Sequence, residues 1–242
     1  DAAIDRWKLK PGEPIDVALY AHGGLVGEEG AADVAARWVP ALYDAKILPV
    51  FVMWETDILS TLKNTLADHL PGELGATERR TAGVRDQLQR WWNDRLERTF
   101  ARPGAFCWNE MKENAGKIPA NPAGGLRQLY DEFVKREPKL KRPVRFHLIG
   151  HSAGAIVQTH LAANLVAAGR AFDSIVLMAA AVRCDTFGAL VKPHLGGRIR
   201  RLASFVLDDE TEQQDPTCKA VFGYGRSLLY LVSESFETER RH

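Results

Sequence analysis

The residues with the clearest potential for chemistry are five consecutive ones, Gly150 to Gly154, which spell Gly-His-Ser-Ala-Gly. A serine in this pattern can occupy a sharp turn between a strand and a helix, because two small flanking residues let the elements approach without a clash. Ser152 would then project its hydroxyl from the carboxyl end of a sheet. The chemistry that this arrangement favours is nucleophilic attack on a carbonyl carbon.

The same pentapeptide also occurs in ordinary glycine-rich connections, where the serine only caps a helix. The flanking sequence favours the strained turn instead. Residues 144–149 alternate apolar and polar side chains as a strand does, and residues 153–168 carry apolar side chains at helical spacing as far as Gly169, a C-cap residue. The sequence therefore predicts a strand, a turn with Ser152 at its apex, and a helix.

A second motif lies upstream, where an apolar strand predicted over residues 15–20 runs into Ala21-His22-Gly23-Gly24-Leu25. Together, the His-Gly-Gly turn and the serine pentapeptide resemble the α/β-hydrolase superfamily, on its lipase- and esterase-like serine hydrolase side. The resemblance covers roughly residues 15–54 and 122–236, and it indicates a superfamily without indicating a substrate.

The resemblance implies an oxyanion hole made by the backbone N–H of Ala153 and that of Gly24 or Leu25. The residues that would shape the two turns are His22, Gly23, Gly150, His151 and Gly154. It also implies the chain order serine, acid, histidine, and a covalent acyl-enzyme that forms without any metal or organic cofactor.

The acid is expected directly after the penultimate strand, where residues 202–207 run into an acidic cluster. Asp208 is the first choice because it comes first after the apolar run. Asp209 is the alternative, and Asp215 is a weaker third because it lies further into the loop. A merely solvated acidic turn is the competing interpretation.

The histidine is the least certain member of the triad. Only His242 follows the last predicted strand, and it is the final residue given, where a side chain is rarely held firmly enough to orient proton transfer. Three alternatives stay open: His242 is the base in a fuller chain, the base lies beyond it, or the enzyme is impaired. The remaining histidines are expected to shape loops, pack or face solvent: His22, His69, His147, His151, His160 and His194.

The alternation of strands and helices predicts an α/β fold with a mostly parallel central sheet of about six strands and helices on both faces. The predicted strands span residues 15–20, 47–54, 144–150, 174–181, 201–208 and 227–235, and the predicted helices span residues 29–45, 122–136, 153–168 and 184–192. The predicted core comprises residues 1–56 and 121–242.

Residues 57–120 interrupt this pattern and predict a helical cap inserted above the carboxyl ends of the strands. The cap contains a charged helix over residues 77–100. Its aromatic residues are candidates for an underside that faces an apolar substrate group, although such residues more often serve packing: Trp91, Trp92, Phe106 and Trp108.

Composition limits the function classes. The 242 residues are 45% hydrophobic and 26% charged with a net charge of +1, so nothing favours nucleic acid as a partner. Three widely spaced cysteines match no zinc site, which indicates a reducing compartment, and we expect a cytoplasmic protein although the sequence begins at Asp1 without a methionine. No apolar stretch is long enough to span a bilayer. The oligomeric state is not predicted.

Two functions follow from the sequence. The first is a carboxylic-ester hydrolase acting on a small acyl substrate with an apolar group; thioesterases, amidases and acyltransferases use the same residues and are not distinguished. The second is a catalytically silent binding domain that presents the basic cap to a partner. The missing or terminal histidine favours the second, and the strained serine turn favours the first.

Overall fold

The computed structural model describes residues 5–24, 28–54, 64, 85–140, 142–215 and 223–237, and for residues 28, 29, 85–88 and 140 it describes the backbone alone. The chain divides into two compact units. Unit 1 comprises Asp1–Thr56 and Glu113–Val206, and unit 2 comprises Asp57–Lys112 and Leu207–His242. Residues 207–242 are therefore grouped with the predicted cap. The division into a hydrolase core and an inserted cap stays a prediction.

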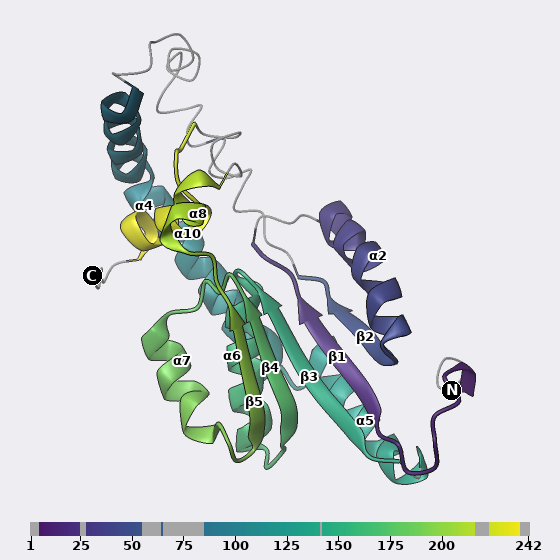
Figure 1. Cartoon of the computed structure of the whole chain (residues 1–242). Coiled ribbons are helices and arrows are strands. Elements are labelled where there is room, and N and C mark those ends of the chain that lie inside the picture. Colours follow the sequence, from purple (N-terminus) through teal and green to yellow (C-terminus); the bar gives the residue numbers. More distant parts are fainter. Residues whose placement is uncertain are drawn as a thin grey trace. The chain divides into compact units, whose positions relative to one another are not determined.

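Unit 1 alternates strands and helices (Figure 1). Its elements are β1 (Ile15–Ala21), α2 (Glu28–Asp44), β2 (Ile47–Val52), the end of α4 (Arg85–Ala120), α5 (Gly125–Leu140), β3 (Val144–His151), α6 (Gly154–Ala167), β4 (Phe172–Met178), α7 (Cys184–Leu190), the short 3₁₀ helix η2 (Lys192–His194) and β5 (Ile199–Phe205).

The five strands form one parallel sheet in the order β2-β1-β3-β4-β5. Parallel neighbours require crossover connections, which the intervening helices supply. The chain moves from β1 outward to β2, then returns to the other side of β1 to form β3. The predicted α/β fold is confirmed, and the described residues form five strands where about six were expected.

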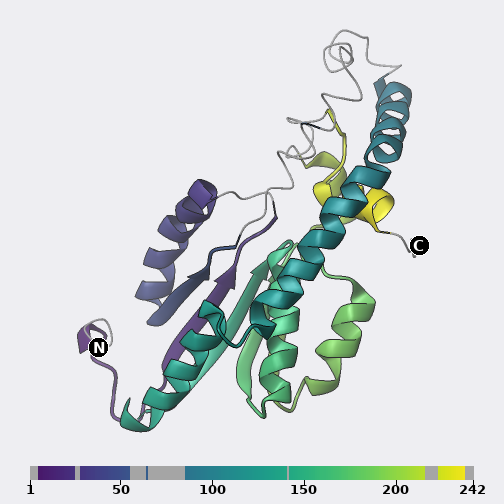
Figure 2. The ribbon, with the colours of Figure 1, turned by 180° about the vertical axis from the view of Figure 1, so that it is seen from behind.

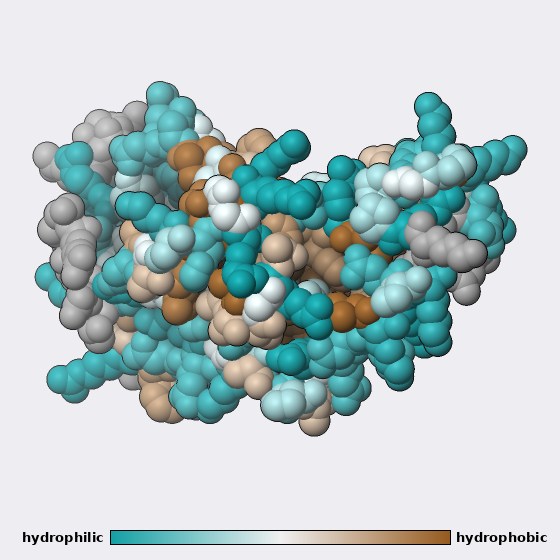
Figure 3. Space-filling model, turned by 90° about the horizontal axis from the view of Figure 1, so that it is seen from below, coloured by the Kyte–Doolittle hydropathy of each residue, from teal (hydrophilic) through white to brown (hydrophobic). Residues whose placement is uncertain are grey.

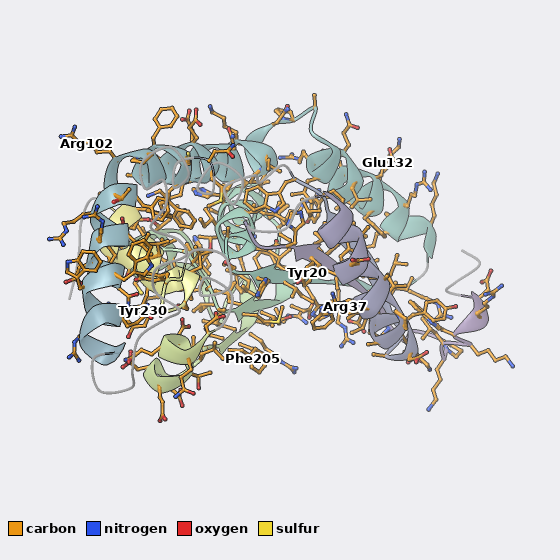
Figure 4. The ribbon with its side chains drawn as sticks, turned by 90° about the horizontal axis from the view of Figure 1, so that it is seen from above. Tyr20, Arg37, Arg102, Glu132, Phe205 and Tyr230 are labelled. Atoms are coloured by element: carbon orange, nitrogen blue, oxygen red, sulfur yellow. The ribbon has the colours of Figure 1, made fainter. Side chains whose placement is uncertain are left out.

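Apolar side chains fill both faces of the sheet. Helices α5 and α6 lie on the face seen in Figure 2, where Val17, Leu148 and Ile175 are buried among them. Helix α2 covers the opposite face over β1 and β2, where Tyr20 lies beneath it (Figure 4). Strands buried on both faces are typical of parallel sheets, so β1 is almost continuously apolar.

Four polar residues interrupt the α2 side of the sheet on adjacent strands. His147 Nε2 lies 2.8 Å from Asp16 Oδ1, and His147 Nδ1 lies 2.8 Å from Ser174 Oγ. Arg145 donates two hydrogen bonds to the Asp16 carboxylate at 2.7 and 2.6 Å. Partial burial opposes ionisation of Asp16, but the hydrogen bonds from Arg145 and His147 prevail and lower the pKa of its carboxyl group.

Unit 2 is built on the first part of α4 and includes α8 (Asp209–Gln214), α10 (Leu228–Leu231) and the π-helical turn η3 (Val232–Phe236). Polar contacts join its two chain segments: the Trp108 indole donates to the Glu237 carboxylate at 2.6 Å, and the Tyr224 hydroxyl donates to the Glu97 carboxylate at 2.7 Å. Phe236 is fully buried, and a Cβ added to Gly104 would run into its ring. The C-terminal segment is therefore packed against α4.

The strand predicted over residues 227–235 is wrong, because this segment is helical. Ser227 caps α10 by accepting a hydrogen bond from the Tyr230 N–H at 3.3 Å. A short apolar run such as residues 228–232 is compatible with a buried helix as well as with a strand, and periodicity alone does not separate the two. The predicted cap helix also differs: α4 extends to Ala120, well past residue 100.

Replacement of Asp16 by Asn is expected to lower the free energy of unfolding by about 1 to 2 kcal/mol at neutral pH, because the ion pair with Arg145 is lost. Since the folded state lowers the pKa of Asp16, this contribution is present above its ordinary pKa of 3.8 and is lost as the pH falls below that value. Denaturant titrations of both proteins at neutral and acidic pH measure it. A difference that persists undiminished in acid would contradict the assignment.

Candidate active site

Ser152 stands at the apex of the turn between β3 and α6 with a backbone φ of 50°, which few non-glycine residues adopt. The neighbouring strand holds this conformation. The Ser152 N–H donates to the Met178 carbonyl at 2.9 Å, and the Ser152 carbonyl accepts from the Ala181 N–H at 3.1 Å. A strained backbone held from both sides places a serine in a defined orientation.

The segment after β4 contributes to the turn at Ser152, which we did not predict from the sequence. The strand predicted to reach residue 181 ends at Met178, because Ala179 turns away with a φ of 44° and donates its N–H to the Phe205 carbonyl at 2.8 Å. This turn brings the Ala181 N–H to Ser152. The available sequence signal was the run of small residues, Ala179 to Ala181.

The two glycines of the pentapeptide are required by close backbone approaches. A Cβ on Gly150 would lie 2.8 Å from the Ala155 Cα, inside the first turn of α6. A Cβ on Gly154 would lie 2.7 Å from the His22 carbonyl oxygen and would also run into the carbonyl of Ala21. The start of α6 is therefore pressed against both β3 and the end of β1.

The His-Gly-Gly turn lies beside the serine. A Cβ on Gly23 would lie 3.1 Å from the Ser152 Cβ and 3.2 Å from His151 Nδ1. The two turns follow β1 and β3, between which the strand order reverses. In open parallel sheets ligands bind at such a reversal point, outside the carboxyl ends of the strands. Both predicted motifs are thus at the position where this topology offers a ligand site.

His22 is held as a neutral part of its turn. Its Nδ1 donates to the Gly23 carbonyl at 2.9 Å, because a carbonyl can only accept, and its Nε2 accepts from the Trp54 N–H at 3.5 Å. Burial lowers the pKa of His22. The Trp54 indole N–H also donates to the His22 carbonyl at 3.1 Å, so Trp54 fixes this turn to the segment that follows β2. We did not predict this role of Trp54 from the sequence.

Of the residues expected to donate to an oxyanion, the structure describes Ala153 and Gly24. Ala153 is buried at the N-cap of α6, where backbone N–H groups and the helix dipole favour negative charge. No residue in the described part of the chain accepts a hydrogen bond from its N–H. Gly24 is buried in the His-Gly-Gly turn, whereas Leu25 lies outside the described residues.

The other histidines differ in their surroundings. His151 is the last residue of β3, next to Ser152, and burial together with the nearby His22 lowers the pKa of its imidazole. His160 on α6 has a pKa that burial lowers, and His194 lies in η2. His69 and His242 lie outside the described residues, so the role expected for His242 stays a prediction.

The candidate acids follow β5 in unit 2. Asp208 is the N-cap of α8 and accepts from the Thr211 N–H at 2.9 Å; hydrogen bonds from Thr211 lower the pKa of its carboxyl group. Asp209 accepts from the Tyr230 hydroxyl and from the Gln213 amide, the latter at 2.7 Å. Asp215 follows the end of α8. Because Ser152 belongs to unit 1, its pairing with any of them stays a prediction.

A second serine, Ser174, is linked by hydrogen bonds to a histidine and, through it, to an aspartate. Ser174 is hydrogen-bonded to His147, which is bonded to Asp16, as described above. Ser174 lies within β4, which is paired with strands on both sides, so nearby N–H groups are used in the sheet. It therefore lacks the free backbone donors that an oxyanion requires.

The four aromatic residues predicted for the underside of the cap differ in burial. Trp92 and Trp108 are buried within unit 2, as packing residues are, whereas Trp91 and Phe106 are 52% and 65% exposed. Of these four residues, only Trp91 and Phe106 are exposed enough to contact another molecule.

Scans against models of protein families, against curated proteins and against solved structures found no match to this chain. None of the helices in the described ranges combines the length and apolarity needed to cross a bilayer.

Replacement of Gly154 by Ala is expected to lower the free energy of unfolding by about 3 kcal/mol or more, since the added methyl group meets the backbone of β1 and its turn. The control is Gly188→Ala in α7, where a Cβ meets no atom within 4 Å and should raise stability by about 0.5 kcal/mol. Thermal unfolding compares the two variants. Equal effects would contradict the close approach of α6 to β1.

Proposed function

We propose that this protein is a serine hydrolase that cleaves a carboxylic ester or a related acyl bond through Ser152. The observation that carries the proposal is the positive φ of Ser152, at a turn pressed against the neighbouring His-Gly-Gly turn. Strained non-glycine backbone is concentrated at functional sites, and a merely capping serine has no need of it.

In the proposed reaction the Ser152 hydroxyl gives its proton to a histidine while its oxygen attacks the carbonyl carbon. The tetrahedral oxyanion accepts hydrogen bonds from the Ala153 N–H and from Gly24 or Leu25. Loss of one such donor typically lowers turnover by about 100- to 1,000-fold. The intermediate then expels the alcohol, which takes up the proton, and leaves an acyl-enzyme that water hydrolyses.

The proposal assigns the base to His242 or to a histidine beyond it, and the acid to Asp208 with Asp209 as the alternative. A base must reach the serine hydroxyl with a nitrogen that can accept a proton. His22 does not meet this requirement, because its Nε2 already accepts from Trp54 and its Nδ1 donates to Gly23.

A second candidate is a catalytically silent domain that binds a partner. The observation that favours it is that both leading acids have local partners: Asp208 caps α8, and Asp209 is bonded to Tyr230 and Gln213. Such contacts account for these carboxylates without any catalytic role. The strain at Ser152 is what this alternative leaves unexplained.

A fluorophosphonate probe distinguishes the two candidates. We expect covalent labelling of the protein at neutral pH, loss of labelling in Ser152→Ala, and full labelling in Ser174→Ala. The Ser174 variant is the matched control, because Ser174 also bonds a histidine but lacks free oxyanion donors. Labelling that survives Ser152→Ala, or a protein that does not react, would contradict the proposal.

Replacement of Asp208 by Asn tests the acid. Asparagine caps a helix as well as aspartate does, so α8 should persist while the negative charge is lost. We expect kcat/KM for a short-chain ester to fall by about 10³- to 10⁴-fold, as when a triad acid is neutralised. The control is Asp209→Asn. A larger loss from that control would identify Asp209 as the acid.

A further inference from the structure

Gln158 on α6 is a completely buried polar residue in the core of unit 1. Polar side chains normally stay in contact with water, and hydrophilic residues cover most of the surface visible in Figure 3. With the exception of Thr159, the other side chains that α6 buries are apolar, because the helix packs against the sheet on the face seen in Figure 2. An amide in such surroundings requires an explanation from its contacts.

The amide of Gln158 joins the two strands that lead to the candidate site. Its Nε2 donates to the Leu19 carbonyl of β1 at 2.7 Å and to the Ile149 carbonyl of β3 at 3.1 Å. The Ile15 N–H donates to the Pro143 carbonyl at 2.9 Å, and every second residue of a strand faces the same neighbour. The carbonyls of Leu19 and Ile149 therefore both point into the seam between β1 and β3, and one amide nitrogen bridges that seam.

The oxygen of the same amide is not used in this way. Both partners of the Gln158 amide are carbonyl oxygens, which only accept, so its nitrogen faces the strands. Its Oε1 is buried, and no residue in the described ranges donates a hydrogen bond to it. A buried acceptor without a donor lowers stability, so an apolar side chain of similar size would suit this core better. The stability of the core alone does not account for a glutamine at this position.

The three elements that Gln158 connects are those whose ends form the candidate site. Strand β1 runs into the turn that contains Gly24, strand β3 ends next to Ser152, and α6 begins directly after Ala153. The expected oxyanion donors thus come from different elements, and each has to lie about 2.7 to 3.1 Å from the oxyanion. Their separation depends on how α6 is held over the seam between β1 and β3.

We infer that Gln158 is a positioning residue for the oxyanion hole, an inference that rests on the proposed function. Its amide fixes α6 to the seam and so sets the distance between the Ala153 N–H and the donor in the turn after β1. Gln158 itself does not touch substrate, because it is completely buried. The oxyanion develops only during the reaction, so a misplaced donor slows turnover without weakening the binding of substrate.

Replacement of Gln158 by Met removes both hydrogen bonds and keeps the length of the side chain. We expect kcat for a short-chain ester, and the rate of fluorophosphonate labelling at Ser152, to fall about 10- to 100-fold, because small misplacements are this costly. KM should change by less than about twofold. The midpoint of thermal unfolding should stay the same or rise, since the buried Oε1 is removed. Gln158→Leu should behave in the same way.

The matched control is Thr159→Val. Thr159 is equally buried, but its hydroxyl donates to the Ala155 carbonyl at 2.8 Å within α6, so kcat and labelling should not change. An unsubstituted protein that neither hydrolyses the ester nor reacts with the probe would contradict the proposed function, and this inference with it. In a reactive protein, three results would overturn the inference alone: Gln158→Met with full kcat, a loss of kcat shared by Thr159→Val or matched by a change in KM, or Gln158 variants that do not fold.

Discussion

The close approach of helix α6 to strands β1 and β3 determines the geometry of the turn at Ser152. Backbone atoms of β3, α6 and the turn after β1 meet at Gly150 and Gly154, where even a methyl group would collide with main chain. Of the three residues between these glycines, Ser152 at the apex of the turn has a positive φ. The strain is offset by packing of the buried face of α6 against β1 and β3.

The order of the strands explains why this approach coincides with a candidate site. Because the chain leaves the neighbouring strands β1 and β3 toward opposite faces of the sheet, the strand order reverses between them, and the turns that follow these strands lie side by side at this reversal point. The His22 turn and the Ser152 turn are those two segments. Trp54, at the end of β2, and Ala181, after β4, hold them from the flanking strands. Four consecutive positions of the sheet therefore contribute to one small region of backbone.

Much of unit 1 could be predicted from the sequence, because β1 is a buried apolar run, β3 alternates apolar and polar side chains, and Gly150 to Gly154 has a local steric requirement. The hydrogen bonds of Trp54 and the turn at Ala179 could not be predicted, since they join residues that become neighbours only in the sheet. The C-terminal segment was predicted as a strand because residues 228–232 are apolar. Its helical state depends on the Ser227 cap and on burial of Phe236. The cap is a local signal and the burial of Phe236 is a tertiary one, and the periodicity of apolar residues contains neither.

We expect Ser152 to form a covalent acyl intermediate with its substrate. The most direct measurement is rapid mixing of the protein with an activated short-chain ester, acid quenching within the first turnover, and mass spectrometry of the intact protein and its peptides. We expect the addition of one acyl group, found on the peptide that contains Ser152. An acyl group on Ser174 or on a histidine, or ester hydrolysis with no acylated protein at any time, would contradict it.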